Sequence, residues 1–263
     1  INNKSLFDKN FWILLNNSKI NNFSGVPYHY EILNKIGLDK ILTNKIKFIT
    51  HAGGQLNSKL TEKILDICLE LNIRFFTMYG QTEASPRMSY LELTKNISKI
   101  GSIGKPLIGG EFWIEGEKEK ITEPNKVGEL NYKGKNVYIG YSNNFHDLKS
   151  NENINNILKT GDLAKFDEDN FWYIEGRKKR IIKIYGERLN LDFMEEKLID
   201  NNYSCVCLEK NNSLFIVSEK NIEKKEISKV LSILANRFEF VKINKFPRSK
   251  NGKIQYKELL KKI

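Results

Sequence analysis

One short stretch of the sequence carries four polar or amphipathic side chains at the end of an apolar run. The stretch MYGQTEAS, residues 78–85, presents an aromatic ring, an amide, a hydroxyl and a carboxylate directly after Phe75 and Phe76. Taken alone, the stretch is better explained as the cap of a following helix, through Thr82 or Glu83.

A second stretch, HAGGQL at residues 51–56, follows a predicted short strand at residues 45–50. Its adjacent glycines indicate backbone that turns sharply or approaches something flat. Helical spacing of apolar residues follows at 58–71, and strand character returns at 73–78. This alternation predicts an α/β layer with a parallel sheet, in which ligand sites lie outside the carboxyl ends of the strands. Both polar stretches should therefore lie at the same edge.

Three further stretches are weak evidence when each is taken alone. GELNYKGKNVYIGY, residues 128–141, is typical of an ordinary hairpin, and Asp162 in KTGDLAKF is typical of a turn. GRKKRIIKIYGERLNL, residues 176–191, predicts a charged linker followed by a strand, and its basic run is interpreted as solvated or ligand-facing charge. Lys253, in the turn KNGK, would usually be a solvated lysine.

Together, the five stretches occur in the order and at the spacing of one known family. From about Gly25 to Ile263 the chain resembles the carboxy-terminal half of the adenylate-forming superfamily, which includes acyl-CoA synthetases, peptide-synthetase adenylation domains and luciferases. These enzymes join a carboxylate to the α-phosphate of ATP, release pyrophosphate and pass the acyl group to a thiol. The resemblance implies an ATP-dependent acid–thiol ligase that uses ATP and Mg²⁺, with CoA or a phosphopantetheine carrier as the acceptor.

The resemblance also implies roles for residues of the two polar stretches. Tyr79 would stack on adenine, Thr82 would contact phosphate oxygens and Glu83 would hold Mg²⁺. The bare backbone of the glycine pair would let adenine lie flat. The residues expected at the nucleotide from these two stretches are Gly53, Gly54, Gln55, Tyr79, Gly80 and Gln81, and the catalytic residues are Thr82, Glu83 and the more distant Lys253.

Later residues match the family's ribose, carboxylate and thiol groups. Asp162 would accept hydrogen bonds from both ribose hydroxyls, since a carboxylate can accept from a diol, and Arg177 would lie near the same sugar. Lys253 would bridge the substrate carboxylate and the adenylate as negative charge develops. Lys179 falls at the family's hinge, and the thiol arm would enter around Lys183 and Gly186.

The expected fold class is α/β with an added α+β unit. Residues 1–177 should form the C-terminal portion of the large AMP-binding domain, with a parallel sheet layer and a small distorted barrel-like β region. Residues 178–263 should form a small, mobile α+β lid domain, with helices near 192–200 and 223–236, strands near 203–208 and 213–218, and a tail helix after 254.

Some family features are absent or altered. Nothing in the chain matches the Ser/Thr/Gly-rich phosphate loop, and GSIGKP at 101–106 lacks the Walker spacing. Residue 1 is Ile rather than Met, so we expect a fragment of a longer protein, with little or no adenylation activity alone. Asn190 stands where many relatives have Glu, which leaves the local bonding of the small domain open.

Composition separates the remaining hypotheses. The net charge is +11, but the lysines are scattered, which argues against a nucleic-acid partner. Three irregularly spaced cysteines fit a reducing cytoplasm, and no apolar run could span a membrane.

The substrate is expected to be an organic acid, with fatty acids among the candidates. Amino-acid activation onto an acyl carrier protein is the alternative. His51 could line the acyl pocket or be a satisfied core histidine.

Overall fold

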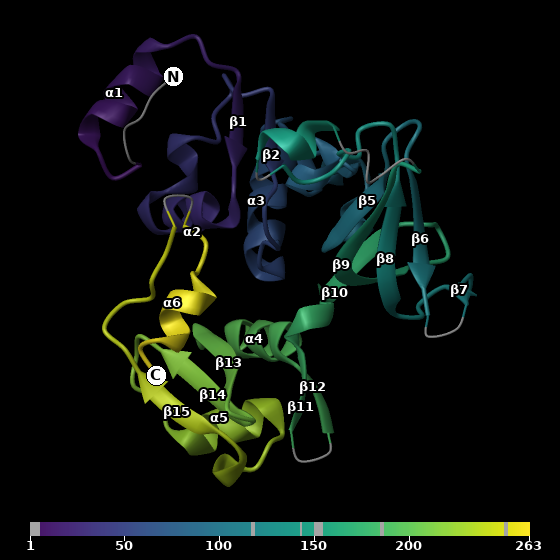
Figure 1. The fold of residues 1–263 in the computed structure, drawn as a ribbon. Helices are drawn as coiled ribbons and strands as arrows, with labels where there is room; N and C mark the ends of the chain where they lie inside the picture. Colours follow the sequence, from purple (N-terminus) through teal and green to yellow (C-terminus); the bar gives the residue numbers. More distant parts are fainter. Residues whose placement is uncertain (1–5, 117–118, 143, 150–154, 185–186, 250–251) are drawn as a thin grey trace. The chain divides into compact units, whose positions relative to one another are not determined.

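The computed structural model of the chain describes residues 6–116, 119–142, 144–149, 155–184, 187–249 and 252–263 (Figure 1). Contacts divide the chain into two compact units. The first comprises Ile1–Thr160 with Ala164–Ile174, and the second comprises Gly161–Leu163 with Glu175–Ile263. The predicted domain boundary at 177/178 lies close to Glu175, and its role as a domain boundary stays a prediction.

The first unit begins with an α/β layer. Its helices and strands are α1 (Lys9–Asn17), β1 (Asn22–Gly25), α2 (Pro27–Ile36), β2 (Phe48–His51), α3 (Ser58–Glu70), β3 (Arg74–Tyr79), β4 (Ser89–Glu92) and β5 (Ser102–Pro106). β1, β2 and β3 are parallel neighbours, whereas β4 pairs antiparallel with β3 and with β5. The predicted strand–helix–strand alternation is confirmed.

The α/β layer is held by one hydrophobic core. The helix α3 buries the apolar residues that recur at helical spacing, because positions three and four apart lie on one face of a helix. Ile64 and Cys68 are fully buried in the same cluster as Ile49 of β2 and Phe75 of β3. This packing fixes the strands whose carboxyl ends carry the two polar stretches.

The second half of the first unit is β-rich. Its strands are β6 (Glu111–Glu115), β7 (Lys120–Ile121), β8 (Gly128–Lys133), β9 (Ile157–Phe166) and β10 (Trp172–Arg177). They continue the sheet in the order β1-β2-β3-β4-β5-β10-β9-β8-β6-β7, ten strands in all among the described residues. The region expected to be barrel-like thus extends the same mixed sheet. Phe112, Tyr132 and Trp172 form its aromatic core.

The predicted hairpin at residues 128–141 is wrong in its second half. β8 pairs with β6 across Glu111–Glu115, and residues 137–141 form no strand. Asn136 and Tyr138 of this segment instead hydrogen-bond to the backbone of the turn after β3.

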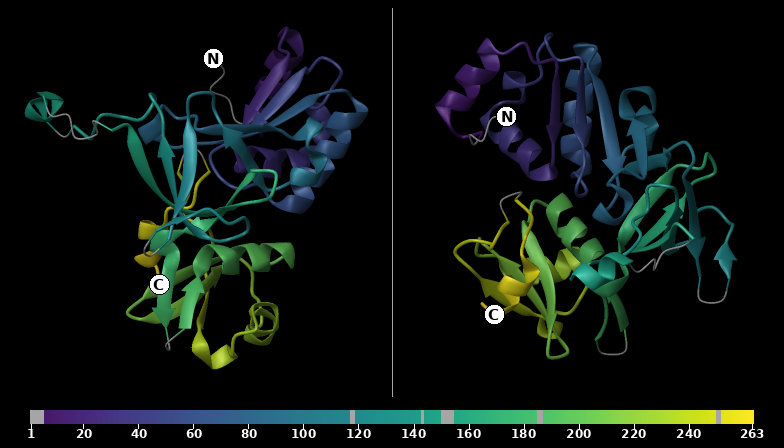
Figure 2. Two further views of the ribbon diagram at one scale, coloured as in Figure 1. Left: turned by 90° about the vertical axis from the view of Figure 1, so that its right-hand side faces the viewer. Right: turned by 45° about the horizontal axis from the view of Figure 1, so that its top comes forward.

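The second unit is a small α+β fold (Figure 2). Its elements are β11 (Ile181–Ile184), β12 (Glu187–Asn190), α4 (Leu191–Asp200), β13 (Cys205–Lys210), β14 (Ser213–Ser218), α5 (Lys224–Leu231), β15 (Glu239–Lys242) and α6 (Tyr256–Leu260). β11 and β12 form an antiparallel hairpin, while β14 pairs antiparallel with β13 and parallel with β15. α5 is shorter than expected, because Ser232 adopts a left-handed conformation with φ of 57° and ends it.

Asn190 has a clear local role in the second unit. Its side-chain oxygen accepts hydrogen bonds from the backbone N–H groups of Asp192 and Phe193, which makes it the N-cap of α4. Its amide nitrogen donates to the carbonyl oxygen of Glu175 at 3.0 Å. The departure from the family's glutamate is therefore accommodated as a helix cap.

Within the described residues, no helix is both long enough and apolar enough to cross a membrane.

Candidate active site

The two polar stretches lie at the same edge of the sheet. β2 and β3 are adjacent and parallel, with His51 in register with Thr77. The Gly53–Gln55 turn follows the carboxyl end of β2, and the Gly80–Glu83 turn follows the carboxyl end of β3. The predicted juxtaposition is confirmed, and this edge is the usual position of ligand sites in parallel α/β sheets.

The turn after β3 has a shape that only glycine permits at residue 80. A Cβ added to Gly80 would lie 1.8 Å from the carbonyl oxygen of Pro86. A single 3₁₀ turn, η2 (Thr82–Ala84), follows, and it ends at Ser85 with φ of 54°. No α-helix begins here and no side-chain cap bond forms at Gln81, so the interpretation of this stretch as a helix cap is wrong. Thr82 is exposed.

A loop distant in sequence fastens this turn. The side-chain nitrogen of Asn136 donates to the carbonyl oxygens of Ala84 and Arg87 at 2.7 and 2.8 Å. The backbone N–H of Tyr138 donates to the carbonyl oxygen of Glu83 at 2.7 Å, and the Ser85 hydroxyl donates to the carbonyl oxygen of Asn136 at 3.0 Å. The loop after β8 therefore packs on the turn instead of completing a hairpin.

The side chains of the turn are held in different ways. The Tyr141 hydroxyl donates to Oε1 of Glu83 at 2.5 Å. Gln81 donates from Nε2 to the carbonyl oxygen of Thr160 at 2.9 Å. The half-buried ring of Tyr79 makes an edge contact with Phe112, with centroids 6.2 Å apart. Stacking of Tyr79 on adenine stays a prediction.

The glycine turn after β2 presents its backbone openly. Gly53, Gly54 and Gln55 are exposed, and Gly53 has a φ of 86°. A Cβ on Gly53 would lie 3.3 Å from Val26, and one on Gly54 would lie 3.3 Å from Pro27. Both contacts are tighter than a side chain usually makes, which agrees with a turn selected for bare backbone.

His51 belongs to the core beneath this turn. It is only 4% exposed, and its ring makes an edge contact with Tyr30, with centroids 6.1 Å apart. Burial lowers the pKa of His51 to about 4, and a hydrogen bond with the backbone of Gly54 opposes this shift. Nε2 is buried without a hydrogen-bond partner in the described part of the chain. His51 is therefore a core residue bonded through one side of its ring.

The structure brings Asp162 of β9 and Arg177 of β10 together, on the parts of these two strands that contacts group with the second unit. Asp162 is buried, and its Oδ1 lies 3.5 Å from Nε of Arg177, whose side chain is 70% exposed. The backbone N–H of Arg177 donates to Asp192 at 2.9 Å. This pair has the composition expected of a ribose site, and that role stays a prediction.

Lys253 is exposed on a tightly bonded turn. Arg248 and Ile254 form a β-bridge, and Nη1 of Arg248 donates to the carbonyl oxygen of Gly252 at 2.8 Å. Ser249 and Lys253 bond twice, through Ser249 N–H to the Lys253 carbonyl at 2.8 Å and Lys253 N–H to the Ser249 hydroxyl at 3.2 Å. The turn thus fixes the backbone and leaves the lysine side chain in solvent.

The basic run near the predicted hinge is not uniformly solvated. Arg177 and Lys179 are exposed, but the Arg180 side chain is only 14% exposed. Its Nε donates to Asp192 at 2.6 Å, its Nη2 pairs with Glu195, and it stacks on Tyr256 with the guanidinium carbon 4.4 Å from the ring centroid. The interpretation of Arg180 as solvated or ligand-facing charge is wrong, because two carboxylates and an aromatic ring from the second unit enclose it.

The strand and loop predicted at the thiol entrance are described in part. Lys183 is exposed on β11 and lies opposite Arg188 of β12. Gly186, predicted to lie at the same entrance, is outside the described residues. The remaining predicted site residues fall into two groups, with the glycine and Glu83 turns in the first unit and Asp162, Arg177 and Lys253 in the second.

The residues of the Glu83 turn fit a magnesium ion bound together with a nucleotide. Mg²⁺ is usually held by one or two carboxylates, with phosphate oxygens and water completing its octahedron. Glu83 supplies one carboxylate, and no group of three His, Cys, Asp or Glu side chains among the described residues forms an all-protein cage. The chemistry of this carboxylate fits such an ion, and the binding of the ion by Glu83 stays a prediction.

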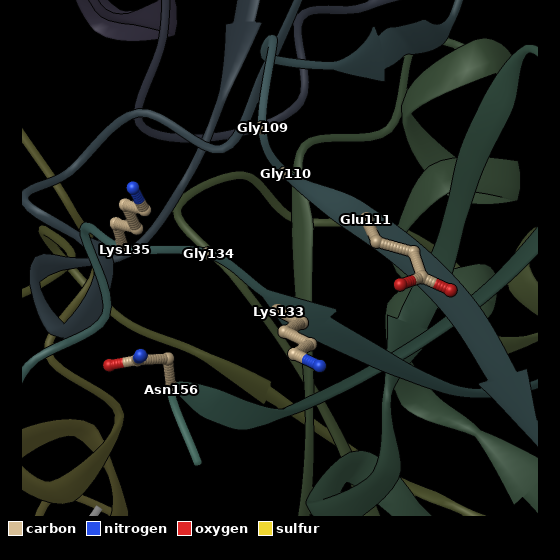
Figure 3. A pocket seen from close by; sticks show the side chains of 7 residues that line it. All are labelled: Gly109, Gly110, Glu111, Lys133, Gly134, Lys135 and Asn156. Atoms are coloured by element: carbon tan, nitrogen blue, oxygen red, sulfur yellow. The ribbon is translucent and has the colours of Figure 1, made fainter. Parts of the chain in front are cut away.

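One cavity lies elsewhere in the first unit (Figure 3). It measures about 440 Å³, and none of the predicted site residues lines it. In Figure 3 the side chains of Glu111, Lys133, Lys135 and Asn156 spread away from one another. Since these groups do not converge, the cavity carries no chemistry comparable to that of the sheet edge.

Comparison with known families identifies the family of the chain. The model of the AMP-binding enzyme family matches residues 2–142. The chain belongs to this family, which is the adenylate-forming superfamily that the five stretches predict.

The chain is similar to particular enzymes of that family. It is 34% identical over 138 residues to the 2-succinylbenzoate–CoA ligase of Bacillus mycoides, a match that covers 52% of this chain and 28% of the ligase. The corresponding ligase of Bacillus cytotoxicus is 32% identical over 171 residues, which cover 65% of this chain and 34% of the ligase. The matched region thus spans about a third or less of these curated relatives.

Solved structures show the same fold. O-succinylbenzoate coenzyme A synthetase from Bacillus subtilis, in complex with AMP, matches 95% of this chain with a TM-score of 0.72 and 25% identity. The same enzyme in complex with ATP and magnesium ion matches with a TM-score of 0.72 and 26% identity. Klebsiella oxytoca NpsA, at 18% identity and a TM-score of 0.77, supports the fold alone. The chain spans 53% to 56% of these structures. It has the fold of the C-terminal part of adenylate-forming enzymes, as the sequence predicts.

Proposed function

We propose that the full-length protein containing this chain is an ATP-dependent acid–CoA ligase. A carboxylate oxygen of the acid would attack the α-phosphorus of ATP, and pyrophosphate would leave. The thiolate of CoA would then attack the acyl carbon, and AMP would leave. The observation that carries the proposal is the position of Glu83 and the Gly53–Gly54 turn at the carboxyl ends of adjacent parallel strands in an AMP-binding family member.

The first step brings two anions together, and the residues of the chain would offset this repulsion. Thr82 would contact phosphate oxygens, and Glu83 would hold the ion that neutralises phosphate charge. Lys253 would supply a point charge to the carboxylate and the adenylate, since its side chain is exposed on a bonded turn. Asp162 would orient the ribose, and this positioning lowers the entropic part of the barrier.

The proposal extends to the acid that the enzyme would activate. The curated relatives at 32% to 34% identity are named 2-succinylbenzoate–CoA ligases, so 2-succinylbenzoate is the first acid to test.

Lys179 would act as the hinge that lets the small unit present first Lys253 and then the strand around Lys183 and Gly186. This alternation would separate adenylation from thiol transfer.

The proposal is tested by ATP–pyrophosphate exchange with the full-length protein. The panel contains 2-succinylbenzoate, fatty acids of several lengths and amino acids, and CoA thioester formation is followed by chromatography. We expect exchange that depends on an organic acid and a CoA thioester of the same acid. Exchange with amino acids followed by loading of a carrier protein would replace the proposal with the alternative activity. Absence of acid-dependent exchange would overturn both.

A further inference from the structure

One contact in the Glu83 turn is not explained by the roles given so far. Oε1 of Glu83 accepts a hydrogen bond of 2.5 Å from the Tyr141 hydroxyl, a length typical of a hydroxyl bonded to a carboxylate. The two residues are far apart in sequence and both belong to the first unit. The Tyr141 ring is itself supported, because it makes an edge contact with Tyr138 with centroids 5.0 Å apart.

Other contacts also hold the loop on the turn. Four other hydrogen bonds, between 2.7 and 3.0 Å, already join the loop at Asn136 and Tyr138 to the backbone and Ser85 of the turn. The Tyr141 bond differs from these because it ends on a side-chain carboxylate. Its effect is therefore on the orientation of the Glu83 carboxylate rather than on the path of the backbone.

We propose that Tyr141 is a positioning residue that fixes the Glu83 carboxylate for a divalent cation. Its hydroxyl donates a hydrogen bond to Oε1 of Glu83, and Oε2 accepts no hydrogen bond from the residues that the structure describes. Oε2 would then remain available to the ion, with the rotation of the carboxylate already restricted. The identity of the ion as a nucleotide-bound divalent cation rests on the proposed function.

Physical reasons favour such an arrangement. A partly exposed glutamate has several rotamers, and ordering them on binding costs free energy that a preformed hydrogen bond avoids. Carboxylates that ligate metals are commonly hydrogen-bonded by a second group, and loss of that group typically weakens metal affinity 10–100-fold. A hydroxyl donor also leaves the charge on the carboxylate in place, so the oxygen facing the ion remains anionic.

The test uses Tyr141→Phe in the full-length protein, because this change removes the hydroxyl and keeps the ring. Mn²⁺ binding is measured by electron paramagnetic resonance with a non-hydrolysable ATP analogue and without acid substrate. We expect Mn²⁺ affinity to fall about tenfold, while binding of the analogue in EDTA stays at the wild-type level. Tyr90→Phe, which removes a hydroxyl from an exposed residue of β4, is the matched control and should leave Mn²⁺ affinity unchanged.

Two further measurements separate positioning from a structural effect. In pyrophosphate exchange, the Mg²⁺ concentration for half-maximal rate should rise about tenfold in Tyr141→Phe, and saturating Mg²⁺ should restore kcat. In a Glu83→Gln background, Tyr141→Phe should cause no further loss of Mn²⁺ affinity. Wild-type Mn²⁺ affinity in Tyr141→Phe, or a loss that Mg²⁺ does not restore, would overturn the inference. If the wild-type protein neither exchanges pyrophosphate nor binds Mn²⁺ with nucleotide, the proposed function fails together with it.

Discussion

The buried imidazole of His51 makes the stability of the protein depend on pH in a calculable way. Burial lowers its pKa from the ordinary 6.5 to about 4, so protons bind more tightly to the unfolded chain than to the folded one. The contribution of neutral His51 to the free energy of unfolding is fully present above the unfolded-state pKa of 6.5, and it is lost as the pH falls towards 4. A shift of this size corresponds to a limiting loss of roughly 3 kcal/mol, of which about 2 kcal/mol appears between pH 8 and pH 5.

The assay has two parts. Urea denaturation between pH 8 and pH 5 gives the free energy of unfolding of the wild type and of His51→Gln. The variant should lose about 2 kcal/mol less than the wild type over this range, whatever its absolute stability. In parallel, nuclear magnetic resonance of the Cε1 protons of histidine should show one signal, absent in His51→Gln, that titrates with a midpoint near 4. A His51 midpoint at or above 6.5 would refute the placement of this ring in the core.

Three other substitutions test separate parts of the structure. Asp162→Asn removes the charge of the predicted ribose acceptor, so nucleotide affinity should fall about tenfold or more in equilibrium binding; an unchanged affinity would remove Asp162 from the site. Arg180→Met leaves Glu195 buried without its cation and should lower the free energy of unfolding by about 3–5 kcal/mol in urea, whereas exposed Lys179→Met should change it by less than about 0.5 kcal/mol. Asn136→Ala deletes the two side-chain bonds from Asn136 to the carbonyl oxygens of Ala84 and Arg87 and should cost about 2 kcal/mol, and a thermal midpoint equal to that of the wild type would show that these two bonds do not stabilise the turn.

The sheet edge could be predicted because its signals are local. Helical spacing at Ser58–Glu70, flanked by two apolar strands, is enough to predict a strand–helix–strand unit. Parallel pairing then follows, and with it the common edge of the two polar turns. The glycines carry their own conformational reason, as the close approach of Pro86 to Gly80 illustrates. These features depend on residues that are close together in the sequence.

The residues that sequence reasoning missed act over long separations. Asn136 bonds to Ala84, and nothing in the local pattern GKN distinguishes this asparagine from one in an ordinary turn. Arg180 sits in a basic run, and such runs are usually solvated, but Glu195 and Tyr256 from later elements enclose it. Tyr141 belongs to a segment whose alternation resembles a strand. Only the folded structure shows that these side chains make specific contacts, rather than lying in an ordinary turn, a solvated basic run or a strand.

The central claim is that the turn after β3 holds the cation for adenylation, and Glu83→Gln in the full-length protein tests it most directly. The substitution keeps the size of the side chain, and the backbone of the turn is held by Asn136 and Tyr138, so circular dichroism and the thermal midpoint should match the wild type. Acid-dependent ATP–pyrophosphate exchange should fall by about a hundredfold or more, as expected when a ligand of the catalytic ion is lost. Exchange at the wild-type rate in the folded variant would contradict the account and leave Glu83 as an ordinary turn residue.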